Sequence, residues 1–378
     1  MTALVYGENH NNTLGLVRSL GEAGHQVILL LMRRKINYVD KSRYVNRTIY
    51  LDAKSNVISA IKKIASDIKE KPVLFTTGDG EASLVDSHFE ELSEYVIPEG
   101  GYKNNDINRY RDKKVSNKLA AEIGFDLPHT WIVTNPNFPP KDITFPVFVK
   151  ANNSIHGGKS VQGIYKNREE LNEWLSTLPK DDFPMQVQEY IDKDYEIMLQ
   201  GCSINHGKKV ISEVANRKVR FYPHIYSAGS YSYSVQVEGN KDLMYLRGLV
   251  TRYLENVGYS GLFSAEFLYS KGRYFFLEIN FRNDGTAYLS TACGYNLSDI
   301  YCRSLKGKII EKMDYKQQSY MNMIADLHHI GKHISFSEWF KQFRNTHCFS
   351  HYNQRDITPY LFYLIIKRKD ILKLIYGA

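Results

Sequence analysis

The sequence predicts a mixed fold, α/β at the N-terminus and α+β beyond it. Over the first hundred residues, short apolar runs alternate with amphipathic stretches, which is typical of βαβ units in a doubly wound parallel sheet. Further along, residues 262–269 and 273–280 are two runs rich in aromatic and branched side chains, joined by Ser270-Lys271-Gly272. This arrangement predicts a β-hairpin and therefore antiparallel pairing in the later part of the chain.

Composition restricts the class of protein. The 378 residues are enough for two or three domains, and 43% hydrophobic with 24% charged residues is typical of globular proteins. The net charge of +8 is spread among acids, which suits anionic small molecules better than nucleic acid. Four cysteines without a CxxC pair favour reduced thiols. With no bilayer-length apolar run and no signal-peptide pattern, we expect a cytoplasmic protein without a transmembrane segment.

The N-terminal elements can be assigned in order. Asn12 or Thr13 is expected to cap the first helix, which Gly24 closes. The loop GENHNN lacks the glycine spacing of a dinucleotide fingerprint. Gly78-Asp79-Gly80 follows a strand, where ligands collect in doubly wound sheets, although a plain turn is an equal alternative. The predicted strands are 3–6, 26–32, 48–51, 73–77 and 95–97, and the predicted helices are 12–23, 57–69 and 81–92.

The hairpin carries a candidate metal site. Glu278 and Asn280 are two residues apart and share a face of their strand, and a turn about Gly272 places Glu266 opposite Glu278. Two carboxylates side by side on an apolar ribbon repel each other, which predicts a cation between them; the alternative is a two-faced strand with solvated acids. Carboxylate and amide oxygens suit Mg²⁺, with Mn²⁺ as an alternative, and Arg282 on the same face could reach an anion held by the metal.

An acid in a strand, followed after a turn by E-x-N-x-R, resembles the signature of the ATP-grasp superfamily. The resemblance implies that Glu266, Glu278 and Asn280 bind Mg-ATP and that Arg282 serves the reacting phosphoryl group. It also implies a doubly wound domain, residues 1–105, followed by two α+β lobes that hold ATP between them. These would be lobe 1, residues 106–195, and lobe 2, residues 196–312, and we expect residues 313–378 to form a C-terminal helical extension.

Two further segments resemble parts that hold the ATP phosphates in this superfamily. A predicted helix, 113–123, begins with D-K, which implies a phosphate contact from Lys113, with Lys114 as the competitor. Lys150 ends an apolar strand and is expected to point to a loop or to a counter-charge. The loop after it resembles the mobile lid of these enzymes, although an ordinary hairpin loop is an alternative. The lid residues expected to contact ATP are His156, Gly157 and Gly158.

The segment 185–196 resembles the linker strand that lies against adenine. The resemblance implies backbone contacts from Glu189 and Ile191, a contact of Gln188 near the amino group, and Glu196 on the ribose hydroxyls. Gln188 stands where many relatives have Glu, but neutral adenine does not require a charge.

Three cations and the C-terminal tail complete the assignment. Arg217, Lys218 and Arg220 end a predicted strand before a flexible polar loop and would suit a carboxylate or phosphate; a basic surface loop is the alternative. We assign catalytic parts to Arg220, Arg282 and Lys150. In the tail, the irregular spacing of His347, Cys348 and His351 argues against a metal site. The last residues predict a helix that packs on the body, with peripheral membrane contact as an alternative.

Within the superfamily, the chain looks most like the carboxylate-amine ligases of the D-aspartate ligase type. That resemblance implies an ADP-forming ligase that joins a small-molecule acid to an amine through an acyl phosphate, and often a homodimer. The alternatives are an ATP-grasp kinase or carboxylase and a non-catalytic ATP-binding protein.

Overall fold

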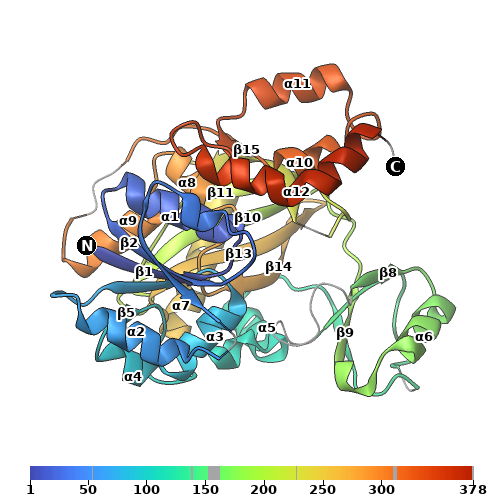
Figure 1. Ribbon diagram of the computed structural model, residues 1–378. Coiled ribbons are helices and arrows are strands. Elements are labelled where there is room, and N and C mark those ends of the chain that lie inside the picture. Colours follow the sequence, from blue (N-terminus) through green and yellow to red (C-terminus); the bar gives the residue numbers. More distant parts are fainter. Residues whose placement is uncertain (53, 138, 152–161, 227, 310–312, 377–378) are drawn as a thin grey trace.

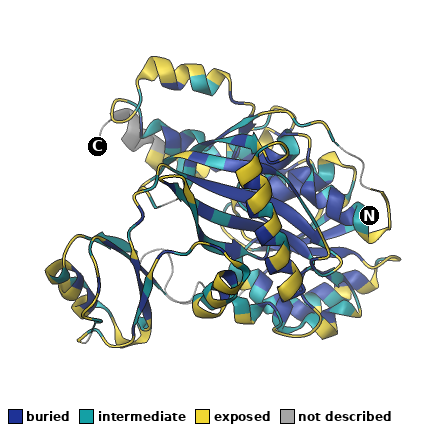
Figure 2. Cartoon of the chain, turned by 180° about the vertical axis from the view of Figure 1, so that it is seen from behind, coloured by how far each residue is buried: buried dark blue, intermediate teal, exposed yellow. Residues whose placement is uncertain are grey.

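The computed structural model describes residues 1–52, 54–137, 139–151, 162–226, 228–309 and 313–376, with side chains up to residue 370. The strands of these residues form sheets of five, seven and four strands. The first two form one body with their helices, whereas the four-stranded sheet belongs to a small lobe, residues 130–189, that projects from the body (Figure 1). Figure 2 shows that the strands of the body are largely buried and that exposed residues lie mainly on outer helices.

The N-terminal sheet is parallel throughout and has helices on both faces. Its strand order is β3 (Val45–Leu51), β2 (Gln26–Met32), β1 (Thr2–Gly7), β4 (Val73–Thr76) and β5 (Ile97–Pro98). Val5 packs in the core formed with α1 (Asn11–Glu22), whereas Leu4 points the other way, into the core formed with α2 (Val57–Ser66). This confirms the predicted doubly wound domain. Its other helical segments are η1 (Val39–Lys41), α3 (Asp79–Ser87) and α4 (Phe89–Ser93).

Two local predictions for this domain are wrong. The cap of α1 is His10, whose Nδ1 accepts a hydrogen bond from Asn12 N at 3.2 Å. The Asn12 side chain cannot cap the helix because it donates to the carbonyls of Thr77 and Asn283, in distant parts of the chain. The predicted helix 81–92 is also two helices, because His88 leaves the helical conformation, with φ −122° and ψ 27°.

The helix predicted at 113–123 is α5 (Lys113–Ile123). Asp112 caps its start, accepting from Lys114 N at 2.7 Å, and Gly124 ends it with a φ of 103°, which glycine adopts without a steric penalty. The small lobe follows and is antiparallel. Its sheet order is β6 (Thr130–Val133), β9 (Met185–Glu189), β7 (Val147–Ala151) and β8 (Gly163–Tyr165), with α6 (Arg168–Thr177) packed on it. Two short 3-10 helices are η2 (Asn108–Arg111) and η3 (Lys180–Asp182).

The seven-stranded sheet is the largest element of the body. Its order is β14 (Arg273–Asn280), β13 (Gly261–Ser270), β10 (Tyr195–Ile204), β11 (Lys209–Phe221), β12 (Gly229–Gln236), β15 (Ser319–Met321) and β16 (Cys348–Phe349). All neighbours are antiparallel except β15 and β16. On one face, α7 (Lys241–Val257) and α5 pack over the apolar side chains of β10 and β13. The other body helices are α8 (Tyr288–Ala292) and α9 (Leu297–Leu305).

The segment that we expected to be a flexible polar loop after the three cations is mostly strand. β11 continues to Phe221, and β12 begins at Gly229 with an alternating pattern, in which Ser230, Ser232 and Ser234 are buried and the tyrosines between them are half-buried. The pattern has the period of a strand, but its buried residues are serines rather than apolar residues. A polar composition was therefore mistaken for a loop.

The C-terminal segment is not purely helical, because β15 and β16 extend the large sheet. Around them lie α10 (Met323–Leu327), α11 (Phe336–Arg344) and α12 (Thr358–Tyr376). The final helix packs on the body as expected: Tyr363 is buried against Tyr38 and stacks on His351, with 3.6 Å between the last two ring centroids. Arg18 of α1 is fully buried and donates to Asp356 Oδ2 at 2.9 Å, which fixes the segment to the N-terminal domain.

A buried carboxylate joins the two sheets of the body. Glu99 Oε2 accepts from Thr76 N of β4 at 3.0 Å, and Oε1 accepts from Leu262 N of β13 at 2.7 Å. Burial raises the pKa of this carboxyl to about 8. One apolar core also runs from the N-terminal sheet to Cys202 and Leu262 of the large sheet, whereas the described core of the small lobe is formed by residues of that lobe.

Candidate active site

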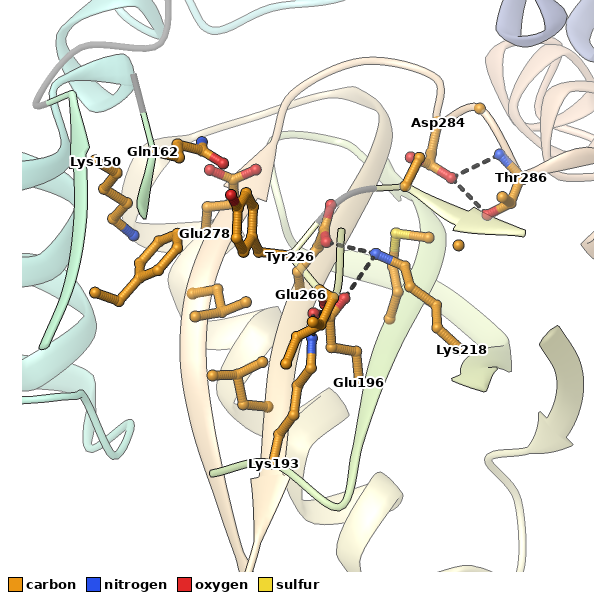
Figure 3. Close-up of a pocket in the computed structure, with 18 of the residues that line it drawn as sticks. Lys150, Gln162, Lys193, Glu196, Lys218, Tyr226, Glu266, Glu278, Asp284 and Thr286 are labelled. Carbon is orange, nitrogen blue, oxygen red and sulfur yellow. Dashed lines mark hydrogen bonds and ion pairs between the residues drawn. The ribbon is translucent and has the colours of Figure 1, made fainter. Parts of the chain in front are cut away.

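A cavity of about 460 Å³ lies where the small lobe, the seven-stranded sheet and the N-terminal domain meet. Figure 3 shows the charged side chains that gather in it. The ends of β7 and β9 line one end, and the loop between β1 and α1 lines the other, together with Tyr320 and Asn322 of the C-terminal segment. Asn11 and Tyr320, which are 309 positions apart, contact each other there: Asn11 Nδ2 donates to Tyr320 Oη at 3.3 Å.

The floor of the cavity is one face of the large sheet. Glu278 lies directly opposite Glu266 across the hairpin, as predicted. A bulge beside this pair leaves Leu277 without a partner, and as a result the consecutive residues Leu277 and Glu278 both line the cavity. Two cross-strand rows, made mostly of polar residues, continue across the sheet. These rows are Glu278-Glu266-Met198-Asn216-Ser234 and Leu268-Glu196-Lys218-Ser232-Tyr320.

The two hairpin glutamates have different electrostatic surroundings. Burial raises the pKa of Glu266, and the neighbouring Glu278 adds to this, against the opposing effect of Lys218. For Glu278 burial also favours the neutral acid, but Lys113 and Lys150 together outweigh it and hold the pKa of that carboxyl below its ordinary value. Glu278 is therefore ionised at neutral pH, and its side chain is 39% exposed to the cavity.

These acids and Asn280 fit a Mg²⁺ ion that takes its remaining ligands from phosphates and water. Asn280 Nδ2 lies 3.4 Å from Glu266 Oε1, and its Oδ1 accepts from Arg282 at 3.3 Å; a 180° rotation of the amide presents the oxygen beside Glu266. No group of three or more His, Cys, Asp or Glu side chains suited to a metal occurs in the described part of the chain. A protein-only site is therefore not formed, whereas Mg²⁺ bound through two carboxylates and a substrate is a common arrangement.

Lys218, in the second row, forms ion pairs with one glutamate of each row. Its Nζ donates to Glu266 Oε2 at 2.8 Å and to Glu196 Oε2 at 3.3 Å (Figure 3), and these acids raise the pKa of the lysine against the effect of burial. Lys193 contacts the other oxygen of Glu196. Of the three predicted cations, only Lys218 lines the cavity. Arg217 instead packs over the ring of Tyr195, with its Cζ 3.7 Å from the centroid.

Two lysines face the hairpin glutamates. Lys113 Nζ lies 4.0 Å from Glu278 Oε2, and both Lys113 and Lys150 line the cavity, whereas Lys114 does not. Lys150 is buried at the end of β7, and its ammonium has no hydrogen-bond partner among the described residues. Burial, with a smaller effect of Lys113, lowers the pKa of Lys150 to about 7. An anion bound between the two lysines would reverse this shift.

The end of the cavity at the small lobe is mainly apolar. Phe148, Ile164 and Leu268 line it, and the chain passes from Gln188 through Ile191 along its side. Gln188 Nε2 donates to Thr130 Oγ1 at 2.9 Å. The Glu189 N–H donates to the His129 carbonyl at 2.8 Å, which leaves only its carbonyl for the expected backbone contact. The Ile191 N–H has no backbone partner in the described chain. Glu196, expected on the ribose, lies between Lys193 and Lys218.

Arg282 lines the cavity, and Asp79, which lies outside the lining, binds its guanidinium. Arg282 Nε donates to Asp79 Oδ1 at 2.8 Å, and Nη2 donates to Oδ2 at 3.0 Å. Arg111 donates to the same carboxylate at 3.1 Å. Although burial raises the pKa of Asp79, the two arginines lower it further, so that it remains ionised. The Gly78-Asp79-Gly80 turn therefore orients a site residue, although Asp79 itself does not line the cavity.

Asp284 also lines the cavity and was not predicted as a site residue. Asp284 Oδ1 accepts three hydrogen bonds, from Gln200 Nε2 at 2.9 Å, Thr286 N at 2.8 Å and Thr286 Oγ1 at 2.7 Å, whereas Oδ2 has no hydrogen-bond partner among the described residues. Against the effect of burial, these bonds to Thr286 and the nearby Lys218 lower the pKa of the carboxyl. An acid directly before the glycine at position 285 was the available signal.

The part predicted for Arg220 is not supported by its position. Its guanidinium donates to both oxygens of Asp326, at 2.9 and 2.6 Å, and to Gln342 Oε1 at 2.7 Å, and it does not line the cavity. Arg220 and Lys218 are two residues apart on β11, so a regular strand would place them on the same face. The strand pairing is irregular between them, and the two side chains have different neighbours. Arg220 therefore anchors the C-terminal segment, and we withdraw it from the catalytic residues.

No family model matches the chain. A curated relative, the D-aspartate ligase of Enterococcus faecium (strain Aus0004), is 25% identical over 324 residues, covering 76% of this chain and 72% of the relative. The N5-carboxyaminoimidazole ribonucleotide synthetase of Thermus thermophilus has a similar structure, with a TM-score of 0.67 and 14% identity over 89% of this chain and 86% of that one. The biotin carboxylase domain of the Hydrogenobacter thermophilus 2-oxoglutarate carboxylase, solved with MgADP and bicarbonate, gives a TM-score of 0.63 with 16% identity, covering 83% and 73%.

The chain has the ATP-grasp fold. The relatives also support the predicted enzyme class, an ATP-dependent carboxylate-amine ligase. The cavity brings together the predicted residues Lys113, Lys150, Glu266, Glu278 and Arg282. The predicted lid residues His156, Gly157 and Gly158 lie outside the described residues.

Proposed function

We propose that this protein couples the conversion of ATP to ADP and phosphate to the formation of an amide bond between a small carboxylic acid and an amine. The observation that supports this most directly is the opposition of two groups across the cavity. Glu266 and Glu278 form its floor, and Lys113 and Lys150 face them. Such an arrangement holds a metal-bound triphosphate from both sides.

In this proposal Glu266, Glu278 and Asn280 hold Mg²⁺, and Mn²⁺ would use the same oxygen ligands. The metal would neutralise phosphate oxygens during phosphoryl transfer. Lys113 and Lys150 bind the phosphates from the opposite wall, and Gln188, Glu189 and Ile191 contact adenine at the apolar end. Glu196, held by two lysines, accepts the ribose hydroxyls.

The proposed reaction has two steps. A carboxylate oxygen of the acid attacks the γ-phosphorus, the bond to the bridging oxygen breaks, and ADP and an acyl phosphate result. The amine nitrogen then attacks the acyl carbon, the phosphate leaves, and the nitrogen loses a proton. Arg282, fixed by Asp79, is placed to stabilise the charge on the transferred phosphoryl group. Closure over the cavity excludes water, which would hydrolyse the acyl phosphate.

The polar end of the cavity is the proposed amine site. Asp284 presents an ionised carboxylate oxygen without a hydrogen-bond partner in the described chain, and an ammonium ion is its natural complement. Asn322 also lines the cavity, and although it occupies the first position before α10, its side chain does not cap that helix. An acceptor that carries a free amino group fits this end better than ammonia alone, because several polar side chains from separate elements converge there.

A matrix of acids and amines tests the proposal. ATP and Mg²⁺ are supplied with each pair, and the release of ADP, AMP and phosphate is measured together with the condensed product. We expect ADP and phosphate only with a specific pair. A stable phosphorylated acid formed without an amine would identify a kinase, and turnover that requires bicarbonate would identify a carboxylase. ATP binding without turnover by any pair would contradict the ligase assignment.

Lys150 predicts proton uptake when ATP binds. Its pKa is about 7 in the folded protein and 10.5 in an ordinary lysine, so between these values the unfolded chain carries a proton that the folded protein lacks. This group therefore makes the folded state more stable as the pH rises through that range. Triphosphate beside Lys150 restores the proton, and we expect uptake just above the lower pKa. Calorimetry in two buffers that differ in ionisation enthalpy measures it.

Lys150→Met is the control for this prediction. The variant should bind ATP more weakly, lose most of the proton uptake and gain stability in the ATP-free state, because a buried ammonium is removed. Unchanged uptake in Lys150→Met would contradict the assignment of the proton to this lysine.

We also propose that the protein works in the cytoplasm and forms a homodimer. All four cysteines are buried and unpaired, which suits a reducing compartment. No helix in the described residues combines the length and the apolar composition that crossing a bilayer requires.

A further inference from the structure

The C-terminal segment concentrates the exposed apolar side chains of the molecule. Of the sixteen large apolar residues that are exposed in the described chain, seven lie within residues 336–366, which is less than a tenth of its length. Phe336 is 64% exposed, Phe340 45% and Leu361 51%. Single exposed apolar residues need no explanation, but such clustering marks an interaction surface. Figure 1 shows that α11 and α12 lie together at one end of the body, with α2 and α4 at the other.

Aromatic rings connect α11 to α12 in an unbroken series. Phe336 stacks on Phe340 with 6.0 Å between ring centroids, and Phe340 contacts Phe343 at 6.4 Å. The contacts then continue from ring to ring at 5.5 to 5.7 Å until they reach α12. We call this set the aromatic row. It consists of Phe336, Phe340, Phe343, Phe349, Tyr352 and Tyr360.

Cations surround these apolar side chains. Residues 331–370 contain seven Lys and Arg against three Asp and Glu, a net charge of +4 out of +8 for the whole chain. One of the three acids, Asp356, is buried and bound to Arg18, so it does not offset the surface charge. On α12, Leu361 and Ile365 share their exposed face with Arg368 and Lys369, because positions spaced by three and four residues lie on one side of a helix.

The body holds α11 by its other side. Trp339 is buried, and its Nε1 donates to Asp326 Oδ2 at 2.9 Å, while Gln342 Oε1 accepts from Arg220 at 2.7 Å. The exposed rings of Phe336 and Phe340 take no part in these contacts, so the fold does not require them to be aromatic. Trp339 and Gln342 attach α11 to the body, whereas Phe336 and Phe340 remain exposed to solvent. These two phenylalanines are therefore available to bind another molecule.

We propose that the aromatic row and the exposed face of α12 bind the surface of a membrane that contains anionic lipids. Phenylalanine and leucine side chains would enter the boundary between headgroups and acyl chains, and the surrounding lysines and arginines would bind lipid phosphates. A protein partner is less favoured because lysine is depleted at the cores of protein interfaces, whereas lysine and arginine beside exposed apolar side chains are typical of interfacial helices. The proposal does not depend on the reaction that the cavity performs.

Sedimentation of the full-length protein with vesicles tests the proposal. Vesicles of phosphatidylcholine mixed with phosphatidylglycerol are compared with vesicles of phosphatidylcholine alone. We expect binding to the mixed vesicles that salt weakens, and little binding to the neutral ones. The double variant Phe336→Ser/Phe340→Ser and the charge variant Lys341→Glu/Arg344→Glu should each lower the partition coefficient by roughly tenfold or more.

Tyr245→Ser is the matched control, because Tyr245 is an aromatic residue on α7 that is 62% exposed. This variant should bind vesicles like the original protein. Each variant is first checked for ATP binding, which a folded protein retains. If neither aromatic nor charged variants change vesicle binding, or if neutral vesicles bind equally well, the proposal is wrong. It is also wrong if the protein self-associates and the phenylalanine variant alone abolishes this, since a second copy would then cover the surface.

Discussion

Replacing Glu278 by Gln should lower ATP turnover by about a thousandfold while the protein stays folded. The amide keeps the shape of the side chain but removes the negative charge that faces Lys113 and Lys150. It also removes half of the carboxylate pair proposed to hold Mg²⁺. Stability should change little, because Glu278 is 39% exposed, its nearest cation is 4.0 Å away, and its charge repels that of Glu266.

ADP release at saturating ATP measures the effect, and thermal unfolding checks the fold. Glu122→Gln is the control, because it makes the same chemical change on the exposed side of α5. Turnover within tenfold of the original protein would contradict the assignment of Glu278 to the metal site.

Replacing Asp326 by Ala should cost about 3 to 5 kcal/mol of unfolding free energy, the largest stability effect that we expect from a single side chain. Asp326 is fully buried and accepts hydrogen bonds from Arg220, from Ser230 Oγ at 2.7 Å and from Trp339 Nε1 at 2.9 Å. Without it, the Arg220 guanidinium, which is 10% exposed, keeps its charge and loses its counter-ion. Urea unfolding measures the loss.

Asp126→Ala provides the comparison for a surface ion pair. Asp126 lies 3.0 Å from Arg273, but the two side chains are 47% and 61% exposed, so the loss of unfolding free energy should be much smaller than for Asp326→Ala. Equal losses in the two variants would show that Asp326 does not stabilise the fold through its buried partners.

Local sequence signals predicted the parts of the fold that depend on neighbours in the chain. The bounds of α5 follow from Asp112 and Gly124, and the hairpin register follows from the turn at Gly272. The cap of α1 was missed because Asn12, a good capping residue, instead binds Thr77 and Asn283. That choice depends on residues 65 and 271 positions away, which a local pattern does not contain.

The candidate site was also predicted from local sequence patterns, which do not contain contacts between distant parts of the chain. Lys113, Glu266 and Glu278 were predicted because each lies in a short segment whose pattern resembles a motif of the superfamily. The position of Arg220 outside the cavity was not foreseen, because its partner, Asp326, lies 106 positions further along. Tyr320 was missed because it lines the cavity only through the pairing of β12 with β15, two strands that are distant in the sequence.

The carboxyl of Glu99 determines which part of the molecule is able to move. Because it receives backbone N–H groups from both β4 and β13, the N-terminal domain and the large sheet cannot separate without breaking two buried hydrogen bonds and dividing a common core. Among the described residues, the small lobe has a separate core that shares no side chain with this common core. We therefore expect the cavity to open by a rotation of the small lobe against the fixed body, with hinges in the connections on either side of residues 130–189.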